Sequence, residues 1–151
     1  MKHFLILLTA FFAAYSYSSA QSSEDSVKAT INQLFAAMKN ADAASLKDAF
    51  ADSAVLQTIG RNKEGKTIIR NEEVSGFADQ IGKLAKDDAD ERITFETIKI
   101  DGPLAIVWTP YKFYYKGSFS HCGVNSFQLV RMNDKWRIVY LIDTRRKTGC
   151  E

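Results

Sequence analysis

The sequence contains few of the residues on which metal and cofactor sites depend. Its 151 residues include only two histidines and two cysteines, and one of the histidines, His3, lies near the N-terminus. His121 and two cysteines that are far apart, Cys122 and Cys150, do not make up a usual zinc ligand set. We therefore expect no metal ion and no bound cofactor.

Two other common site motifs are also lacking. Gly60, Gly65 and Gly76 are isolated from one another, so the chain has no glycine-rich loop to hold a phosphate. No serine lies in the strand–turn–helix elbow of the serine hydrolases. Both absences argue against a nucleotide-binding enzyme and against a serine hydrolase.

The one long apolar run lies at the N-terminus. Lys2 precedes apolar residues 4–14, and residues 15–20 end in small side chains, which is typical of a secretory signal peptide cleaved after Ala20. The run is shorter than the roughly 20 residues of a membrane-spanning helix. We expect residues 1–20 to be removed and residues 21–151 to form one soluble domain that is periplasmic or secreted.

The charge of this domain is nearly balanced. The full sequence has 20 basic and 18 acidic residues, and loss of Lys2 with the leader leaves 19 basic residues. Such a balance gives no electrostatic reason to expect nucleic acid or a membrane surface as a partner.

Hydrophobic spacing predicts three helices followed mainly by strands. Apolar residues at helical spacing follow capping residues at Ser22 and Asp42 and recur over residues 74–84. Alternating patterns predict strands over residues 54–59, 66–70 and 92–100, and three long strands between residues 103 and 146. Residues 86–91 are expected to form a charged loop. Helices on one face of an antiparallel sheet make an α+β fold.

Two tight turns, at residues 116–117 and 133–134, set the expected register of the three long strands. Strict alternation from the first turn pairs Trp108 with Asn125 on the concave face of the sheet. That face is then an apolar wall with a few polar groups, the usual composition of a small-molecule site. The candidate ligand-binding residues are Trp108, Lys112, His121, Asn125, Tyr140 and Thr144.

The same register leaves the convex face more apolar than a solvated surface usually is. We therefore expect a homodimer through this face of the sheet. The residues expected to form the interface are Val107, Tyr111, Phe113, Val124 and Leu141.

Two segments resemble the nuclear transport factor 2-like superfamily, whose fold is a cystatin-like α+β cone. They are FAAMKNADAASLKDAFADSAVL, in which two helices run into a strand, and the closing strand KWRIVYLIDTRR. WTPYKFYYKGSFSHCGVNSFQLVR followed by IDTRR is similar to the branch called putative lumazine-binding. The resemblance covers nearly all of residues 21–151 and implies a conical pocket between helices and sheet. Because the fold hosts isomerases, cyclases, dehydratases, epoxide hydrolases and non-catalytic binders, it does not decide the function.

Three residues are candidates for acid–base chemistry. Histidine titrates near neutral pH, which suits His121 to this chemistry, but the simpler interpretation, which we favour, is a hydrogen-bonded residue of the wall. Asp143 could be or orient a base, but strict alternation places it on the face opposite His121 unless a bulge intervenes. Isomerases of the superfamily place a carboxylate and a tyrosine deep in the pocket. Tyr140 offers the phenol, but we expect no acid on the concave face, and the paired aspartates flanking an arginine of the epoxide hydrolases are not visible.

Cys122 lies next to His121, which suggests a thiolate nucleophile, but neighbouring strand residues face opposite ways. Export favours instead a disulfide between Cys122 and Cys150. The sequence leaves both the bridged and the free state open.

From the sequence we expect an exported protein that binds a small, flat, partly aromatic ligand of the lumazine type without catalysis. One alternative is a small dehydratase- or isomerase-like enzyme that uses His121 as general acid or base. The other is a non-catalytic dimeric interaction module whose pocket is only packed core.

Overall fold

The computed structural model describes residues 22–150, so the expected signal peptide lies outside the described residues. The helices are α1 (Ser23–Lys39), α2 (Ala43–Asp48) and α3 (Val74–Ile81). The strands are β1 (Phe50–Arg61), β2 (Thr67–Glu72), β3 (Ala89–Ile93), β4 (Thr97–Asp101), β5 (Leu104–Tyr115), β6 (Ser118–Met132) and β7 (Lys135–Thr144). Within the described part of the chain, no helix has the length and apolar character needed to cross a membrane.

The first two helices begin at the predicted capping residues. The Ser22 hydroxyl accepts a hydrogen bond from the Asp25 backbone N–H at 3.0 Å. The Asp42 carboxylate accepts from the N–H groups of Ala44 and Ser45, at 3.1 and 3.0 Å. Each cap satisfies N–H groups that have no partner within the helix, which fixes where the helix starts.

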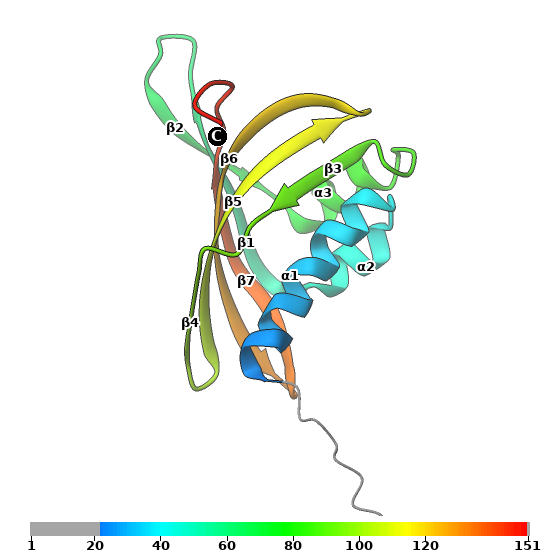
Figure 1. Ribbon diagram of the computed structural model, residues 1–151, viewed down its shortest axis with the longest axis vertical. Coiled ribbons are helices and arrows are strands. Elements are labelled where there is room, and N and C mark those ends of the chain that lie inside the picture. Colours follow the sequence, from blue (N-terminus) through cyan, green and yellow to red (C-terminus); the bar gives the residue numbers. More distant parts are fainter. Residues whose placement is uncertain (1–21, 151) are drawn as a thin grey trace, which may run out of the picture.

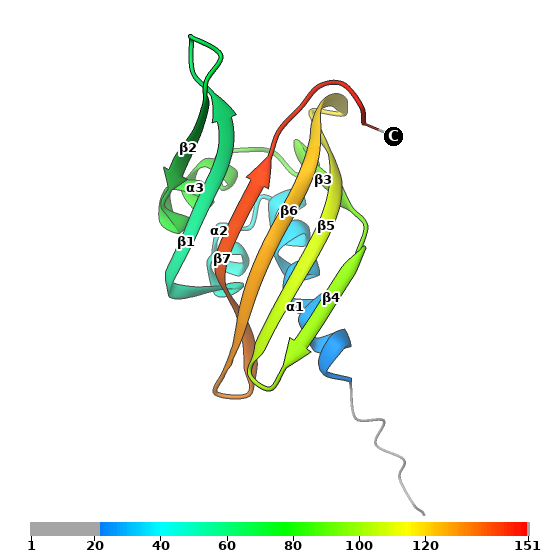
Figure 2. The ribbon, with the colours of Figure 1, turned by 90° about the vertical axis from the view of Figure 1, so that its left-hand side faces the viewer.

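The strands form one curved sheet in the order β2-β1-β7-β6-β5-β3, and β4 pairs with the remaining length of β5. All pairs are antiparallel except β1 and β7, which are parallel. The three helices cover one face of this sheet (Figure 1), and the other face carries no helix (Figure 2). The α+β prediction is confirmed, with a mixed rather than wholly antiparallel sheet.

The strand expected over residues 92–100 is two strands. β3 pairs with the end of β5 near the β5–β6 turn, and β4 pairs with its beginning. Residues 89–91, expected in a loop, therefore belong to a strand. This difference places Glu91 beside Phe113 of β5.

Both expected turns occur, with positive φ at residues 116–117 and 133–134. Two bulges nevertheless change the register away from them. Phe113 pairs with His121 while Tyr114 pairs with Phe119, so Ser120 is an extra residue on β6. Gln128 pairs with Tyr140 while Leu129 pairs with Ile138, so Val139 is an extra residue on β7.

Each bulge inverts the faces of the residues beyond it, because side chains alternate along a strand. Asn125 is consequently paired with Thr109 and Asp143 instead of Trp108 and Ile142. The sheet face that we expected for each side chain of β5, and for each side chain in the second half of β7, was therefore wrong.

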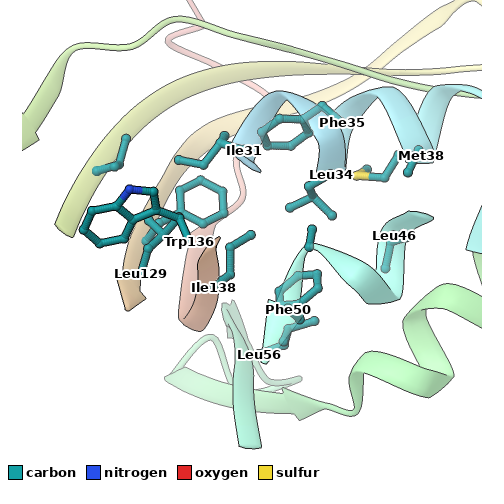
Figure 3. Packing of buried hydrophobic residues seen from close by; sticks show 14 of the residues in the cluster. Ile31, Leu34, Phe35, Met38, Leu46, Phe50, Leu56, Leu129, Trp136 and Ile138 are labelled. Atoms are coloured by element: carbon teal, nitrogen blue, oxygen red, sulfur yellow. The ribbon is translucent and has the colours of Figure 1, made fainter. Parts of the chain in front are cut away.

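The core fills the space between α1, α2 and the concave face (Figure 3). Ile31 and Leu34 of α1 face Leu129 and Ile138 of the sheet, and these side chains are at most 1% exposed. A large apolar side chain buried in this way contributes roughly 1.5–3 kcal/mol. Trp136 packs beside Leu129, so this part of the cone is closed by side chains. The open part lies nearer the β5–β6 turn.

Candidate functional site

A cavity of about 150 Å³ lies between α1, α3 and the concave face of the sheet. Most of its wall is apolar, and aromatic rings come from both the helices and the sheet. The apolar lining residues are Leu34, Phe35, Met38, Leu56, Phe77, Ile81, Phe113 and Leu141. Polar side chains enter this wall mainly from β3, β5, β6 and β7. The two bulges bring those of β5 and of the end of β7 to the same face as those of β6.

Glu91 and Asn125 form the central polar pair of the cavity. The Asn125 amide Nδ2 donates to Glu91 Oε1 at 2.8 Å. Burial raises the pKa of the Glu91 carboxyl to about 7, the Asn125 hydrogen bond opposes the rise, and the nearby Asp143 carboxylate adds to it. Glu91 forms no ion pair with another described residue that would hold it ionised, so the protonated carboxyl is available near neutral pH.

Asp143 is the second carboxyl group of the cavity, and it is held by three partners. Thr58 Oγ1 donates to Oδ1 at 2.6 Å, and Arg145 Nε donates to Oδ2 at 2.8 Å. The Tyr111 hydroxyl lies 3.2 Å from Oδ2 and 2.9 Å from the Thr144 carbonyl oxygen. Burial and the neighbouring carboxylates raise the pKa of Tyr111, so this phenol stays protonated and acts as a donor.

His121 lies at the edge of the polar group, between two aromatic rings. Its ring centroid is 5.0 Å from that of Phe113 and 5.7 Å from that of Tyr111. Nδ1 lies 3.0 Å from the Ser120 hydroxyl. Burial, and then the positive charge of Arg145, lower the pKa of His121. The imidazole is therefore mainly neutral at pH 7 and offers one donor and one acceptor.

Gly123 permits a close approach of the end of β7. A Cβ atom at this position would lie 1.7 Å from the Thr144 carbonyl oxygen and 2.8 Å from Tyr111 Cε1. Only a residue without a side chain lets Tyr111 reach both the Thr144 carbonyl and Asp143.

With this geometry established, comparison with known proteins gives the family. The family described as "Putative lumazine-binding" matches residues 22–141. The chain belongs to this family. Comparison with curated protein sequences gives no significant match.

Solved structures resemble this member of the putative lumazine-binding family in fold. An NTF2-like protein of unknown function from Shewanella baltica is 16% identical, covers 83% of this chain and 94% of its own, and has a TM-score of 0.64. A domain of unknown function with a cystatin-like fold from Nostoc punctiforme is 17% identical, with 87% and 81% covered and a TM-score of 0.65. An NTF2-like protein of unknown function from Methylobacillus flagellatus is 17% identical, with 82% and 91% covered and a TM-score of 0.62. At these identities the likeness shows the nuclear transport factor 2-like fold.

The structure of this putative lumazine-binding family member brings together three of the residues singled out in the sequence. Asn125 and His121 line the cavity, as expected, and Asp143 lies there too. The bulge at Val139 brings Asp143 to the same face as Asn125. The expectation that no acid faces the cavity was wrong, because Glu91 and Asp143 both do.

The other candidates point away from the cavity. Trp108 is 45% exposed on the convex face. Lys112 pairs with Cys122 behind the cavity, and Thr144 accepts a hydrogen bond from the Val124 N–H at 3.1 Å. The Tyr140 hydroxyl donates to Gln57 Oε1 at 2.6 Å. Each was misplaced because the expected register lacked the bulges.

Sequence reasoning missed Glu91, Tyr111 and Arg145. Glu91 lies in a run of charged residues that is typical of a loop. This run lacks the hydrophobic alternation by which a short strand would be recognised. Tyr111 was assigned to the convex face by the shifted register. Arg145 was not singled out in the sequence, although Asp143 two residues earlier offered it a partner of opposite charge.

Cys122 and Cys150 form a disulfide in the structure, with an S–S distance of 2.01 Å. Backbone hydrogen bonds between Cys122 and Arg146, at 2.9 and 2.8 Å, hold the same segment. The bond therefore fastens the chain that follows Arg145 against β6. Among residues 22–150, no three His, Cys, Asp or Glu side chains are grouped so as to hold a metal ion.

Proposed function

We propose that this protein binds a small, uncharged, ring-shaped organic molecule in the cavity between its helices and sheet. The observation that carries the proposal is the Glu91–Asn125 pair, joined at 2.8 Å inside an otherwise apolar and aromatic wall. A mostly apolar cavity with a few convergent polar groups is the usual form of a small-molecule site. The same cavity argues against an interaction module whose interior is only packed core.

The cavity volume limits the size of the ligand. A volume of about 150 Å³ equals that of an engineered apolar cavity that binds benzene. It accommodates one six-membered ring. A flat heterocycle of the lumazine type has two fused rings, so one of them would lie outside the enclosed volume, toward the mouth.

Thermal unfolding with a panel of single-ring compounds tests this function, since a ligand that binds the folded state raises Tm by mass action. We expect Leu141→Phe, which fills part of the cavity, to abolish the rise. Leu104→Phe is the matched control, because Leu104 is 45% exposed on the convex face. A panel that raises no Tm, or a rise that survives Leu141→Phe but not Leu104→Phe, would contradict the proposal.

Proton-transfer catalysis is a second candidate function, and Glu91 favours it. A carboxyl group with a pKa of about 7 in a mostly apolar cavity suits a general acid or base better than His121, whose pKa is lowered. Exchange of solvent deuterium into cyclohexanone, followed by NMR, tests this role. We expect Glu91→Gln to abolish any acceleration and His121→Ala to retain it. The reverse result would assign the role to His121.

A homodimer through the convex face is the assembly we propose. Of the five residues first expected there, all but Val124 lie on the concave side, namely Val107, Tyr111, Phe113 and Leu141. In their place Leu104, Ile106 and Trp108 form an apolar row on β5, and these side chains are 42–45% exposed. An apolar row of this kind on an open sheet favours contact with a second copy, and the near-zero net charge of the domain leaves little repulsion between copies.

Export is the location we propose, on the basis of the N-terminal signal-peptide pattern and the Cys122–Cys150 disulfide. Disulfides persist in oxidising compartments and are rare where thiols are kept reduced. Mass spectrometry of the protein from its native host would show a chain beginning at Gln21, and a chain retaining residues 1–20 would contradict export by cleavage.

A further inference from the structure

Hydrogen-bonding capacity is left over at the Glu91–Asn125 pair. Glu91 Oε1 accepts one hydrogen bond, from Asn125, and no other described side chain or backbone group bonds the carboxyl. A protonated carboxyl has one O–H donor and a carbonyl oxygen that can accept a second bond. On the neighbouring strand, Thr109 pairs with Asn125, and its buried hydroxyl has no partner within residues 22–150. Buried polar groups are normally satisfied. Thr109 does not line the cavity, so the free hydrogen-bonding capacity that a ligand can reach is that of the Glu91 carboxyl.

Most of the charged groups near the pair are themselves paired. Asp143 is ion-paired with Arg145 at 2.8 Å, Tyr111 is a protonated phenol, and His121 is mainly neutral. Glu72 also lines the cavity and accepts a hydrogen bond from Gln80 at 3.0 Å. With Glu91 protonated, the Glu91–Asn125 pair carries no charge, and Glu72, which has no ion-pair partner among the described residues, is hydrogen-bonded to Gln80. An ionic ligand group placed at the pair would therefore find no counter-charge there to offset the loss of its hydration.

The wall favours a flat ligand. Phe113 and the His121 ring lie 5.0 Å apart on the sheet side, and Phe77 of α3 lines the opposite side. Aromatic side chains bind a flat ring by stacking or edge contacts. The volume of about 150 Å³ allows one such ring.

We propose that Glu91, positioned by Asn125, recognises the edge of an uncharged single-ring molecule in which an N–H group lies next to a C=O group. This inference rests on the proposed ligand-binding function and names the chemical class of its ligand. The ring N–H donates to Glu91 Oε1, which already accepts from Asn125. The protonated Oε2 donates to the ring carbonyl. Both oxygens of the carboxyl group are then used, and the two bonds fix the ring in the plane of the carboxyl.

Three probes of similar size separate this inference from simple filling of the cavity. 2-Pyridone has adjacent N–H and C=O groups, N-methyl-2-pyridone lacks the N–H, and benzene lacks both. By calorimetry at pH 6 we expect 2-pyridone to bind about 10-fold more tightly than N-methyl-2-pyridone, because a lost buried hydrogen bond costs about 1 kcal/mol or more. Benzene should bind weakly at the same site. Protonated benzylamine, a single ring with a cation, should not bind.

Two variants and a change of pH identify Glu91 as the group that discriminates. Glu91→Gln keeps one donor and one acceptor without titrating, so it should retain the preference at pH 6 and pH 8. In the parent protein the affinity for both pyridones should fall at pH 8, where Glu91 loses the proton that it donates to the ring carbonyl, whereas the affinities of Glu91→Gln should be the same at both pH values. Glu91→Leu should bind 2-pyridone and N-methyl-2-pyridone equally.

The possible failures are distinguishable. If benzene binds but 2-pyridone is not preferred, or if Glu91→Leu keeps the preference, the recognition role of Glu91 is wrong while the ligand-binding function stands. Tighter binding of benzylamine than of 2-pyridone would overturn the neutral-ligand class. If no probe binds, the ligand-binding function itself fails.

Discussion

Asn125 on β6 reaches across β5 to Glu91 on β3, with 2.8 Å between its amide nitrogen and the carboxyl oxygen. The two residues are 34 positions apart in the sequence. They meet because the bulge at Ser120 places Phe113 of β5 on the same face as Asn125 and because Glu91, in the short strand β3, is paired with Phe113. The contact joins three strands at the polar end of the cavity.

Asn125→Leu should separate a binding role from a structural one. Leucine keeps most of the volume and removes both the donor and the acceptor. We expect unchanged folding by circular dichroism and a loss of about 1–3 kcal/mol in the free energy of 2-pyridone binding, the usual effect of unpairing a buried polar group. Asn32→Leu, on the exposed side of α1, is the matched control and should bind normally. Equal affinity in the two variants would remove Asn125 from the site.

Glu91 should make stability depend on pH in a defined direction. Its pKa in the folded protein, about 7, lies above the ordinary value of 4.5, so the folded state binds this proton more tightly than the unfolded chain. The resulting stabilisation is complete below pH 4.5 and is lost as the pH rises through 7.

The variant Glu91→Gln lacks this titration, and urea unfolding of both proteins at pH 5 and pH 8 measures the effect. We measure the free energy of unfolding of the variant minus that of the parent. This difference should be roughly 3 kcal/mol higher at pH 8 than at pH 5, which is the free energy of a pKa shift of this size. The same difference between the two proteins at both pH values would show that Glu91 does not titrate in this range.

Gly123→Ala should be strongly destabilising. Its Cβ would lie 1.7 Å from the Thr144 carbonyl oxygen, and a clash with backbone is not relieved by turning a side chain. We expect a loss of about 3 kcal/mol or more in urea unfolding. Gly76→Ala, in α3 with no atom within 4 Å of the added Cβ, should be neutral or stabilising by up to about 1 kcal/mol. Similar effects of the two substitutions would contradict this packing.

The helices and turns could be predicted from the sequence because their signals are local. Ser22 and Asp42 cap their helices, and the turns at residues 116–117 and 133–134 occur as expected. The bulges at Ser120 and Val139 could not be predicted in this way. A bulge arises from how two strands twist and pack against their neighbours, and neither residue marks it locally.

The candidate site was accordingly only half predicted. Asn125 and His121 lie on the β6 segment between the two bulges, and their expected facing survived. Residues of β5 and of the second half of β7 exchanged faces, which is why Trp108 and Tyr140 were expected in the cavity and Tyr111 and Asp143 were found there. Glu91 depends on a long-range pairing of β3 with β5, and charged residues 86–91 give no hydrophobic alternation to reveal it.

Trp108→Asp should disrupt the proposed dimer. Its side chain is 45% exposed in the apolar row of β5, and a carboxylate there would have to be buried unpaired in the interface. We expect a monomer by light scattering. Phe119→Asp is the control, because Phe119 is also 45% exposed but lies beside the β5–β6 turn, and it should remain dimeric. A dimeric Trp108→Asp protein would place the interface elsewhere.

The most direct test of ligand binding in the cavity is a titration of 2-pyridone into protein with ¹³C-labelled leucine methyl groups, followed by NMR. Leu56 and Leu141 line the cavity, whereas Leu104 lies on the convex face. We predict saturable shifts of the Leu56 and Leu141 methyl signals while the Leu104 signals stay in place. Saturable shifts at Leu104 alone, or none at any leucine, would contradict a binding site between the helices and the sheet.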